Sequence, residues 1–354
     1  MPRTSLLVGA AAAAAAAWWV LWRRRRKQRH TPRPLPPRMA AVAASLTREQ
    51  LNYALVEFRG VPVNPSFDVA FLERLTAEFV PRAGDHADVF VNSYPKAGTT
   101  WTQTICFHLA HGGSPPPGRS MYATVPWIDT LASSNAVLRA REGCDYTLDD
   151  LAAFPADRPR FFKAHATVSD IPGGGARGGG GARVVYVARN PKDTVVSLWH
   201  HARDKPEFAL RAGEAVAPDF EQFVRLFLAG QAECGSWFDH NLAWFAASRA
   251  EPSRVLFLQY ETMFADPTAA VRRIAAFVGL DGDDEALVAR TVEGSSMETM
   301  RKGAGAINVR AGGSGKWRKM IKPGSELDQL FNETYLQQME GSGLVFDFGE
   351  GVFM

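Results

Sequence analysis

The chain has 354 residues, a formal net charge of +3 at pH 7 and three cysteines. Residues 1–47 hold nine Lys or Arg and no Asp or Glu, so subtracting these nine charges leaves −6 for residues 48–354. An acidic domain lacks the wide basic face that binding to nucleic acid requires, which excludes that class of partner. Cys106, Cys144 and Cys234 are odd in number and widely spaced, which indicates a reducing compartment and no metal site.

The N-terminal segment, residues 1–47, differs from the rest of the chain. Residues 6–22 contain only Leu, Val, Gly, Ala and Trp, and the basic run 23–29 follows at once. Seventeen residues is the lower limit for a membrane-spanning helix, and the basic flank would hold the following domain in the cytosol. Two other interpretations stay open: an organelle-targeting peptide, because no acidic residue precedes Glu49, and an Ala-rich tail. Residues 31–38 include four prolines and are expected to form a linker.

Residues 48–354 are long enough for a single α/β domain with a sizeable core. Buried strands are predicted from apolar runs at 88–93, 160–165, 183–188 and 255–261. Helices are predicted from apolar spacing at 68–80, 102–109, 222–227, 236–247 and 267–277. Strands that alternate with helices predict a parallel sheet covered on both faces, with ligands at the carboxyl ends of the strands.

The first predicted strand of this sheet runs into the segment Tyr94-Pro95-Lys96-Ala97-Gly98-Thr99-Thr100-Trp101. A strand that breaks at Pro and Gly and then opens a helix presents backbone N–H groups to an anion, and a Lys and two hydroxyls add to that site. The Lys precedes the Gly, unlike the order G-x-x-x-x-G-K-[ST] of an ATPase loop. The segment therefore predicts a phosphate- or sulfate-binding loop. No carboxylate follows it in the manner of a Mg²⁺ site, so no metal is implied.

Two further segments follow the anion loop in the chain and have a distinctive pattern of basic residues and glycines or helix-start residues. Arg189-Asn190-Pro191-Lys192-Asp193-Thr194-Val195-Val196-Ser197 follows the predicted strand 183–188, and Arg310-Ala311-Gly312-Gly313-Ser314-Gly315-Lys316-Trp317-Arg318 is a basic, Gly-rich loop. Taken together, the three segments resemble those of the cytosolic-type sulfotransferases, which transfer a sulfuryl group from 3′-phosphoadenosine 5′-phosphosulfate (PAPS). The resemblance spans roughly residues 48–345 and implies a P-loop-like sheet flanked by helices in one globular domain.

The resemblance also implies a role for individual residues. Lys96 would stabilise the leaving phosphate, and His165 in Phe162-Lys163-Ala164-His165 would be the general base, with Lys163 holding the transferring group. Ser197 would act in catalysis and bind the 3′-phosphate with Arg189, and Trp101 would stack on adenine. The complete predicted PAPS-binding set is Lys96, Ala97, Gly98, Thr99, Thr100, Trp101, Arg189, Ser197, Tyr260, Ser295, Arg310, Ala311 and Gly312.

Several alternatives remain open at this level. By residue type alone, His108, His111, His200 and His201 are candidates for the base as much as His165 is. Arg301-Lys302-Gly303 also matches the family's Arg-Lys-Gly, but the register set by Gly315 and Trp317 favours Arg310, with Ala311 in place of the usual Lys.

The function that the sequence favours is sulfuryl transfer to a hydroxyl or amine of a small molecule. Residues 125–129 resemble the family segment that lines the acceptor pocket. The competing functions are a nucleotide kinase or NTPase that uses the same anion loop, and an inactive nucleotide-binding adaptor. The oligomeric state is left open because the family's short dimer motif is not visible.

Overall fold

The computed structural model describes residues 33–131, 150–154, 156–172, 181–302, 313–349 and 351–354. The chain divides into residues 1–34 and 35–354, and nearly all described residues belong to the second unit. The predicted anchor at residues 6–22 lies outside the described residues. None of the helices that the structure describes combines the length and the apolarity needed to cross a membrane.

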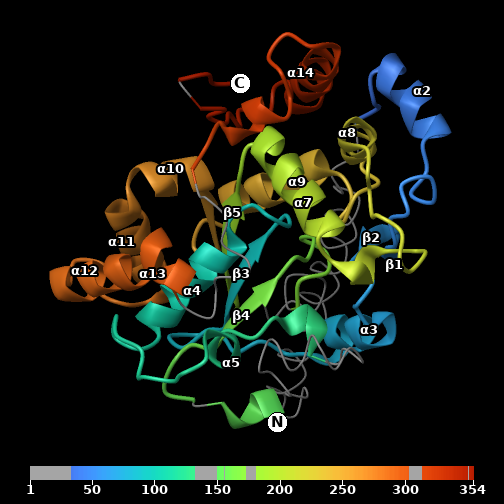
Figure 1. The fold of residues 1–354 in the computed structure, drawn as a ribbon. Coiled ribbons are helices and arrows are strands. Elements are labelled where there is room, and N and C mark those ends of the chain that lie inside the picture. The colour runs from blue at the N-terminus through green and yellow to red at the C-terminus, as the bar shows by residue number, and fades with distance from the viewer. Residues whose placement is uncertain (1–32, 132–149, 155, 173–180, 303–312, 350) are drawn as a thin grey trace, which may run out of the picture. The chain divides into compact units, whose positions relative to one another are not determined.

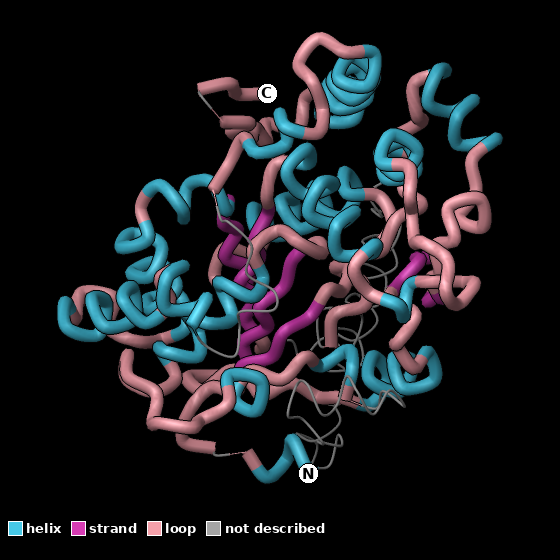
Figure 2. Tube along the Cα trace, in the orientation of Figure 1, coloured by secondary structure: helices cyan, strands magenta, loops and turns pink. Residues whose placement is uncertain are grey.

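The centre of the second unit is a parallel sheet with the strand order β4-β3-β5-β6. Figure 2 shows its strands at the centre with helices to either side. The register pairs Val89 with both Phe161 and Arg183, and Val184 with Val255. The prediction of an α/β fold with a parallel sheet is thereby confirmed. The strand bounds are β3 Val89–Ser93, β4 Phe161–Ala164, β5 Arg183–Ala188 and β6 Val255–Gln259.

Alternate residues of the strands belong to two different hydrophobic clusters. Val89 and Val91 pack with one set of helices, α4 (Thr99–Leu109), α11 (Pro267–Val278) and α12 (Glu285–Gly294). Phe90 belongs to the cluster of another set, α7 (Pro191–Arg203), α8 (Phe220–Leu228) and α9 (Trp237–Ala250). Val185 and Tyr186 divide between the two clusters in the same way. Successive side chains of a strand point to opposite faces, so the sheet is covered on both faces, as predicted (Figure 1).

Several helices begin after a residue whose side chain accepts a hydrogen bond from the helix N-terminus. Asp68 does so for α3, Asn190 for α7 and Ser236 for α9. Strand β6 ends at Gln259, two residues before the predicted end, because Tyr260 opens helix α10. The helix bounds are α2 Pro37–Ser45, α3 Val69–Glu78, α4 Thr99–Leu109, α5 Met121–Thr124, α7 Pro191–Arg203, α8 Phe220–Leu228, α9 Trp237–Ala250, α10 Tyr260–Ala265, α11 Pro267–Val278, α12 Glu285–Gly294, α13 Met297–Lys302 and α14 Glu326–Met339.

Two small elements lie outside the central sheet. Strands β1 Val56–Phe58 and β2 Val61–Val63 form an antiparallel hairpin. Helix α2 packs on the domain, because Met39 is fully buried and the carbonyl of Ala43 accepts a hydrogen bond from Gln231. The packed core therefore includes residues that precede position 48.

Candidate active site

A cavity of about 370 Å³ lies where the four parallel strands end. Each strand delivers a predicted residue to it: Lys96 follows β3, His165 follows β4, Arg189 follows β5 and Tyr260 follows β6. The predicted site residues that line the cavity are Lys96, Gly98, Thr99, Thr100, Trp101, Lys163, His165, Arg189, Ser197 and Tyr260. Ala97 is buried within the anion loop. Arg310, Ala311 and Gly312 lie outside the described residues.

The loop between β3 and α4 has a backbone that only a few residue types tolerate. Lys96 has φ 69° and Gly98 has φ 112°. A Cβ at position 98 would lie 2.7 Å from Cδ2 of Tyr260, so the close approach requires glycine there. No side chain caps the N-terminus of α4. Its first N–H groups are thus available to an anion in the cavity, as the sequence predicted.

We call the residues around this loop the anion side of the cavity: Lys96, Thr100, Trp101, Arg189, Ser197 and Tyr260. The Arg189 guanidinium lies 4.5 Å from the ring centroid of Tyr260 and donates a hydrogen bond to the carbonyl of Gly313 at 3.0 Å. Arg189 Nε is buried and has no hydrogen-bond partner among the described residues. Trp101 packs its ring edge-on against Tyr260 at 5.6 Å. A buried, unpartnered guanidinium N–H beside an uncapped helix N-terminus fits a phosphate group.

Asp193 connects the anion side to the basic, Gly-rich segment 310–318, which we call the C-terminal loop and of which residues 313–318 are described. The sequence did not predict this role of Asp193. Its carboxylate accepts hydrogen bonds from the backbone N–H of Gly315 at 2.8 Å and of Trp317 at 3.0 Å. It also accepts one from Asn190 Nδ2 at 2.8 Å. The carboxylate thus fixes the loop that carries Lys316 against the start of α7. The available signal was the Asn-x-x-Asp spacing at the beginning of a helix, which indicates a cap rather than a long-range contact.

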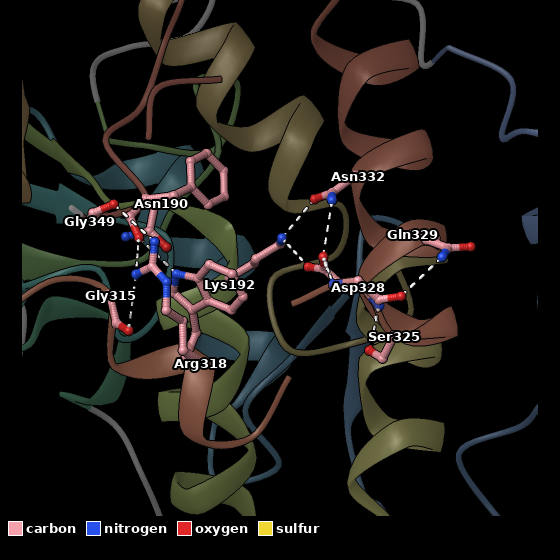
Figure 3. A network of polar contacts seen from close by, with 12 residues as sticks. Asn190, Lys192, Gly315, Arg318, Ser325, Asp328, Gln329, Asn332 and Gly349 are labelled. Atoms are coloured by element: carbon pink, nitrogen blue, oxygen red, sulfur yellow. Dashed lines mark hydrogen bonds and ion pairs between the residues drawn. The ribbon is translucent and has the colours of Figure 1, made fainter. Parts of the chain in front are cut away.

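Lys192 extends this connection to helix α14 (Figure 3). Its buried Nζ donates to Asp328 Oδ1 at 2.5 Å and to Asn332 Oδ1 at 2.7 Å. The same ammonium lies 4.2 Å from the ring centroid of Trp317. The Arg318 guanidinium lies 4.6 Å from the same ring centroid and donates to the carbonyls of Phe348 and Gly349, each at 3.0 Å. The C-terminal loop is therefore held by Asp193 and Lys192 at the start of α7, and Lys192 is itself paired with Asp328 of α14.

A second group of residues that line the cavity, which we call the histidine side, consists of Trp127, Lys163, His165, His200, His201 and Glu233. The backbone N–H of His165 donates to Asp129 Oδ2 at 2.9 Å, and its Nδ1 lies 2.9 Å from the carbonyl oxygen of Ser93. A carbonyl only accepts, so this contact assigns the hydrogen to Nδ1 and leaves a lone pair on Nε2. Burial, and then the charge of Lys163, hold the pKa of His165 well below its usual value. His165 is therefore a neutral imidazole.

Asp129 aligns two members of the histidine side. Its Oδ2 accepts from Trp127 Nε1 at 2.9 Å as well as from the His165 backbone. Burial raises the pKa of Asp129 to about 6. Lys163 Nζ lies 3.7 Å from the ring centroid of Trp127. The predicted acceptor-pocket segment 125–129 therefore contributes Trp127 to the cavity wall and Asp129 to the support of the predicted base.

The four other histidines that the sequence left as candidates for the base separate into two groups. His108 and His111 bond to the backbone of their own helix or its exit loop and do not line the cavity. His200 and His201 do line it. His201 Nδ1 lies 3.4 Å from Lys96 Nζ. Burial, and then the charge of Lys96, hold the pKa of His201 well below its usual value, so this imidazole can accept from the ammonium.

Ser295 lies apart from the cavity. It is buried after α12, and its hydroxyl donates to the carbonyl of Thr291 at 2.7 Å. Met297 and Met300, from the following helix α13, line the cavity instead. The predicted contact of Ser295 with the nucleotide remains a prediction.

Comparisons with known proteins identify the family of this chain. Residues 86–343 match the family model described as the sulfotransferase domain. The human protein Sulfotransferase 4A1 is 30% identical over 82% of this chain and 92% of its own. Cytosolic sulfotransferase 5 of Arabidopsis thaliana is 27% identical over 73% of this chain and 81% of its own.

A solved structure, retinol dehydratase in complex with androsterone and the inactive cofactor PAP, has the same fold. It superposes with a TM-score of 0.66 at 20% identity, over 89% of this chain and 98% of its own. The chain belongs to the sulfotransferase family. It is an enzyme that transfers a sulfuryl group from PAPS to a small-molecule acceptor. This assignment replaces the kinase and NTPase alternative.

Proposed function

We propose that the cavity performs sulfuryl transfer from PAPS to a hydroxyl or amine group, with the nucleotide on the anion side and the acceptor on the histidine side. The observation that carries this proposal is the meeting of Lys96 and a neutral His165 in one cavity. PAPS, when bound, supplies the activated sulfuryl group and a phosphate leaving group. The protein's own residues position it, balance its charge and remove a proton.

On the anion side, the fit to the nucleotide rests on unused donors. The N–H groups of α4, with Thr99 and Thr100, suit the 5′-phosphosulfate, and Lys96 suits the oxygen on which charge develops. Arg189, with its unpartnered Nε, and Ser197 suit the 3′-phosphate. Trp101 and Tyr260 give the adenine an aromatic wall.

On the histidine side, His165 Nε2 takes the proton of the acceptor group. The Ser93 carbonyl holds the hydrogen on Nδ1, so the lone pair stays on Nε2. Asp129 fixes the backbone of His165. Lys163, on the same strand, adds positive charge beside the group that is transferred.

The proposed location is the cytosol, and the anchor at residues 6–22 remains a prediction. The name of the relative Cytosolic sulfotransferase 5 supports the first statement. A full-length fusion should partition with membranes and resist carbonate extraction if the segment spans. Protease added outside sealed vesicles should then digest the catalytic domain, whereas its protection would contradict a cytosolic domain.

The experiment that tests the proposed function is PAPS consumption by the full chain, screened against phenols, steroids, fatty alcohols and amines. We expect acceptor-dependent formation of PAP with at least one class. Binding of PAPS without turnover in any class would favour the inactive-adaptor alternative instead.

A further inference from the structure

Two cavity-lining residues keep a buried polar side-chain atom without a hydrogen-bond partner in the described part of the chain. They are Arg189 on the anion side, through Nε, and Glu233 on the histidine side, through Oε2. A buried polar atom without a partner costs free energy, so each marks a place where a ligand group is expected. In the proposed function, the 3′-phosphate is the partner of Arg189. No partner is assigned to Glu233.

Glu233 is held firmly in the loop between α8 and α9. It is 2% exposed, and its Oε1 accepts from Asn64 Nδ2 at 3.1 Å. Asn64 cannot turn its amide around, because its Oδ1 accepts from the backbone N–H of Ser66 at 2.9 Å. The next residue, Cys234, donates its backbone N–H to the carbonyl of Pro62 at 2.7 Å. Oε2 is therefore fixed as the unused oxygen of this carboxylate.

The charges around Glu233 keep this oxygen an acceptor for part of the molecules at neutral pH. Burial raises the pKa of Glu233 to about 7, and Asn64, Lys96, Lys163 and Lys205 oppose the rise. The other carboxylate that lines the cavity in the described residues, Asp193, already accepts backbone N–H bonds on both oxygens. Glu233 Oε2 is thus a hydrogen-bond acceptor without a partner among the described residues, whereas both carboxylate oxygens of Asp193 already accept hydrogen bonds.

We propose that Glu233 selects acceptors that carry a second hydrogen-bond donor, an ammonium or hydroxyl group, besides the group that is sulfated. This inference rests on the proposed function. The second donor bonds to Oε2 while the first group meets His165 Nε2. A site with a buried polar group discriminates strongly against an analogue that leaves it unpaired, so an acceptor with a hydrogen atom in place of the second donor is disfavoured.

The test uses three phenols that differ only in the end of a para-ethyl chain: 4-ethylphenol, 4-(2-hydroxyethyl)phenol and 4-(2-aminoethyl)phenol. The variant is Glu233→Gln. Asn64 still donates to Oε1 of the new amide, which places an N–H donor where Oε2 was. Glu214→Gln is the matched control, because it removes the same charge from an exposed carboxylate that does not line the cavity.

The wild type should use at least one donor-bearing phenol about tenfold better than 4-ethylphenol in kcat/KM. Which of the two is preferred distinguishes an ammonium from a hydroxyl partner. Glu233→Gln should lose this preference, because its kcat/KM should fall about tenfold more for the preferred donor-bearing phenol than for 4-ethylphenol. Glu214→Gln should keep the wild-type preference.

Calorimetric binding of the three phenols to the complex with PAP provides a second measurement, independent of turnover. No preference in either turnover or binding overturns the proposal, as does an equal loss for all three phenols in Glu233→Gln. Failure of the proposed function would look different, because PAP itself would then fail to bind or no acceptor of any class would be sulfated.

Discussion

The two sides of the cavity are built in different ways. The anion side comes mainly from one continuous loop and helix start, residues 94–101, and from segments that follow β5 and β6. The histidine side is assembled from residues near 127, 163–165, 200–201 and 233. Binding a phosphate depends on backbone N–H groups and therefore on a compact sequence pattern. Shaping an acceptor pocket depends on side chains that separate loops bring together, and no short pattern records them.

The largest effect is expected on the histidine side. His165→Ala should lower kcat by about two to four orders of magnitude, because the acceptor proton loses its base. The affinity for PAP should remain near that of wild type, since the proposed contact of His165 is with the acceptor and not with the nucleotide. Steady-state turnover and calorimetric binding of PAP measure the two quantities. An equal loss of PAP affinity would assign His165 to the anion side.

The sequence predicted more of the anion side than of the histidine side, for a physical reason. The anion loop and the N-terminus of α4 belong to one continuous segment, so the motif predicted the anion site, although not the positive φ of Lys96 and Gly98. Asp193 and Glu233 depend on partners far away in the chain, Gly315 and Asn64. No periodicity or spacing signals such contacts.

Lys96→Ala tests the centre of the anion side. It should lower kcat by about two to three orders of magnitude, because the positive charge matters most where the leaving oxygen becomes anionic. Lys302→Ala is the control, since Lys302 is exposed and paired with Glu298 on the surface of α13. Turnover near that of wild type in Lys96→Ala would remove the residue from the reaction, provided that both variants melt at the wild-type temperature.

Arg310 and Arg301 are expected to differ in their contribution to PAPS affinity. A forked contact with phosphate contributes about 1.5–3 kcal/mol, so Arg310→Ala should weaken PAPS binding by about tenfold or more. Arg301→Ala, from the exposed end of α13, should have a much smaller effect. The difference should vanish with a nucleotide that lacks the 3′-phosphate. Greater damage from Arg301→Ala would show that Arg301-Lys302-Gly303 is the working segment.

Asp193 gives a smaller effect on the same loop. Asp193→Asn weakens two charge-assisted bonds to the backbone of Gly315 and Trp317, and PAP affinity should fall by about three- to tenfold. The kcat at saturating PAPS should change little, which separates positioning of the loop from chemistry. A kcat that falls while PAP affinity is retained would contradict this role.

The smallest effect concerns pH. Burial and Lys163 hold the pKa of His165 below 6.5, so the imidazole remains neutral as the pH falls to that value. With an acceptor that lacks a second hydrogen-bond donor and therefore does not depend on Glu233, the kcat/KM, which reports groups of the free enzyme, should stay flat from pH 8 to about 6.5 and decline only below it. A decline that is centred above pH 7 and disappears in His165→Ala would show a raised pKa instead.

A single-turnover experiment tests the central claim most directly. The full chain is loaded with PAPS labelled in the sulfuryl group and is then mixed with an acceptor chosen from the screen. The cavity described here predicts that each bound PAPS yields one PAP and one sulfated acceptor, and that His165→Ala retains the label on the nucleotide. Release of PAP without labelled acceptor, or equal transfer by His165→Ala, would contradict it.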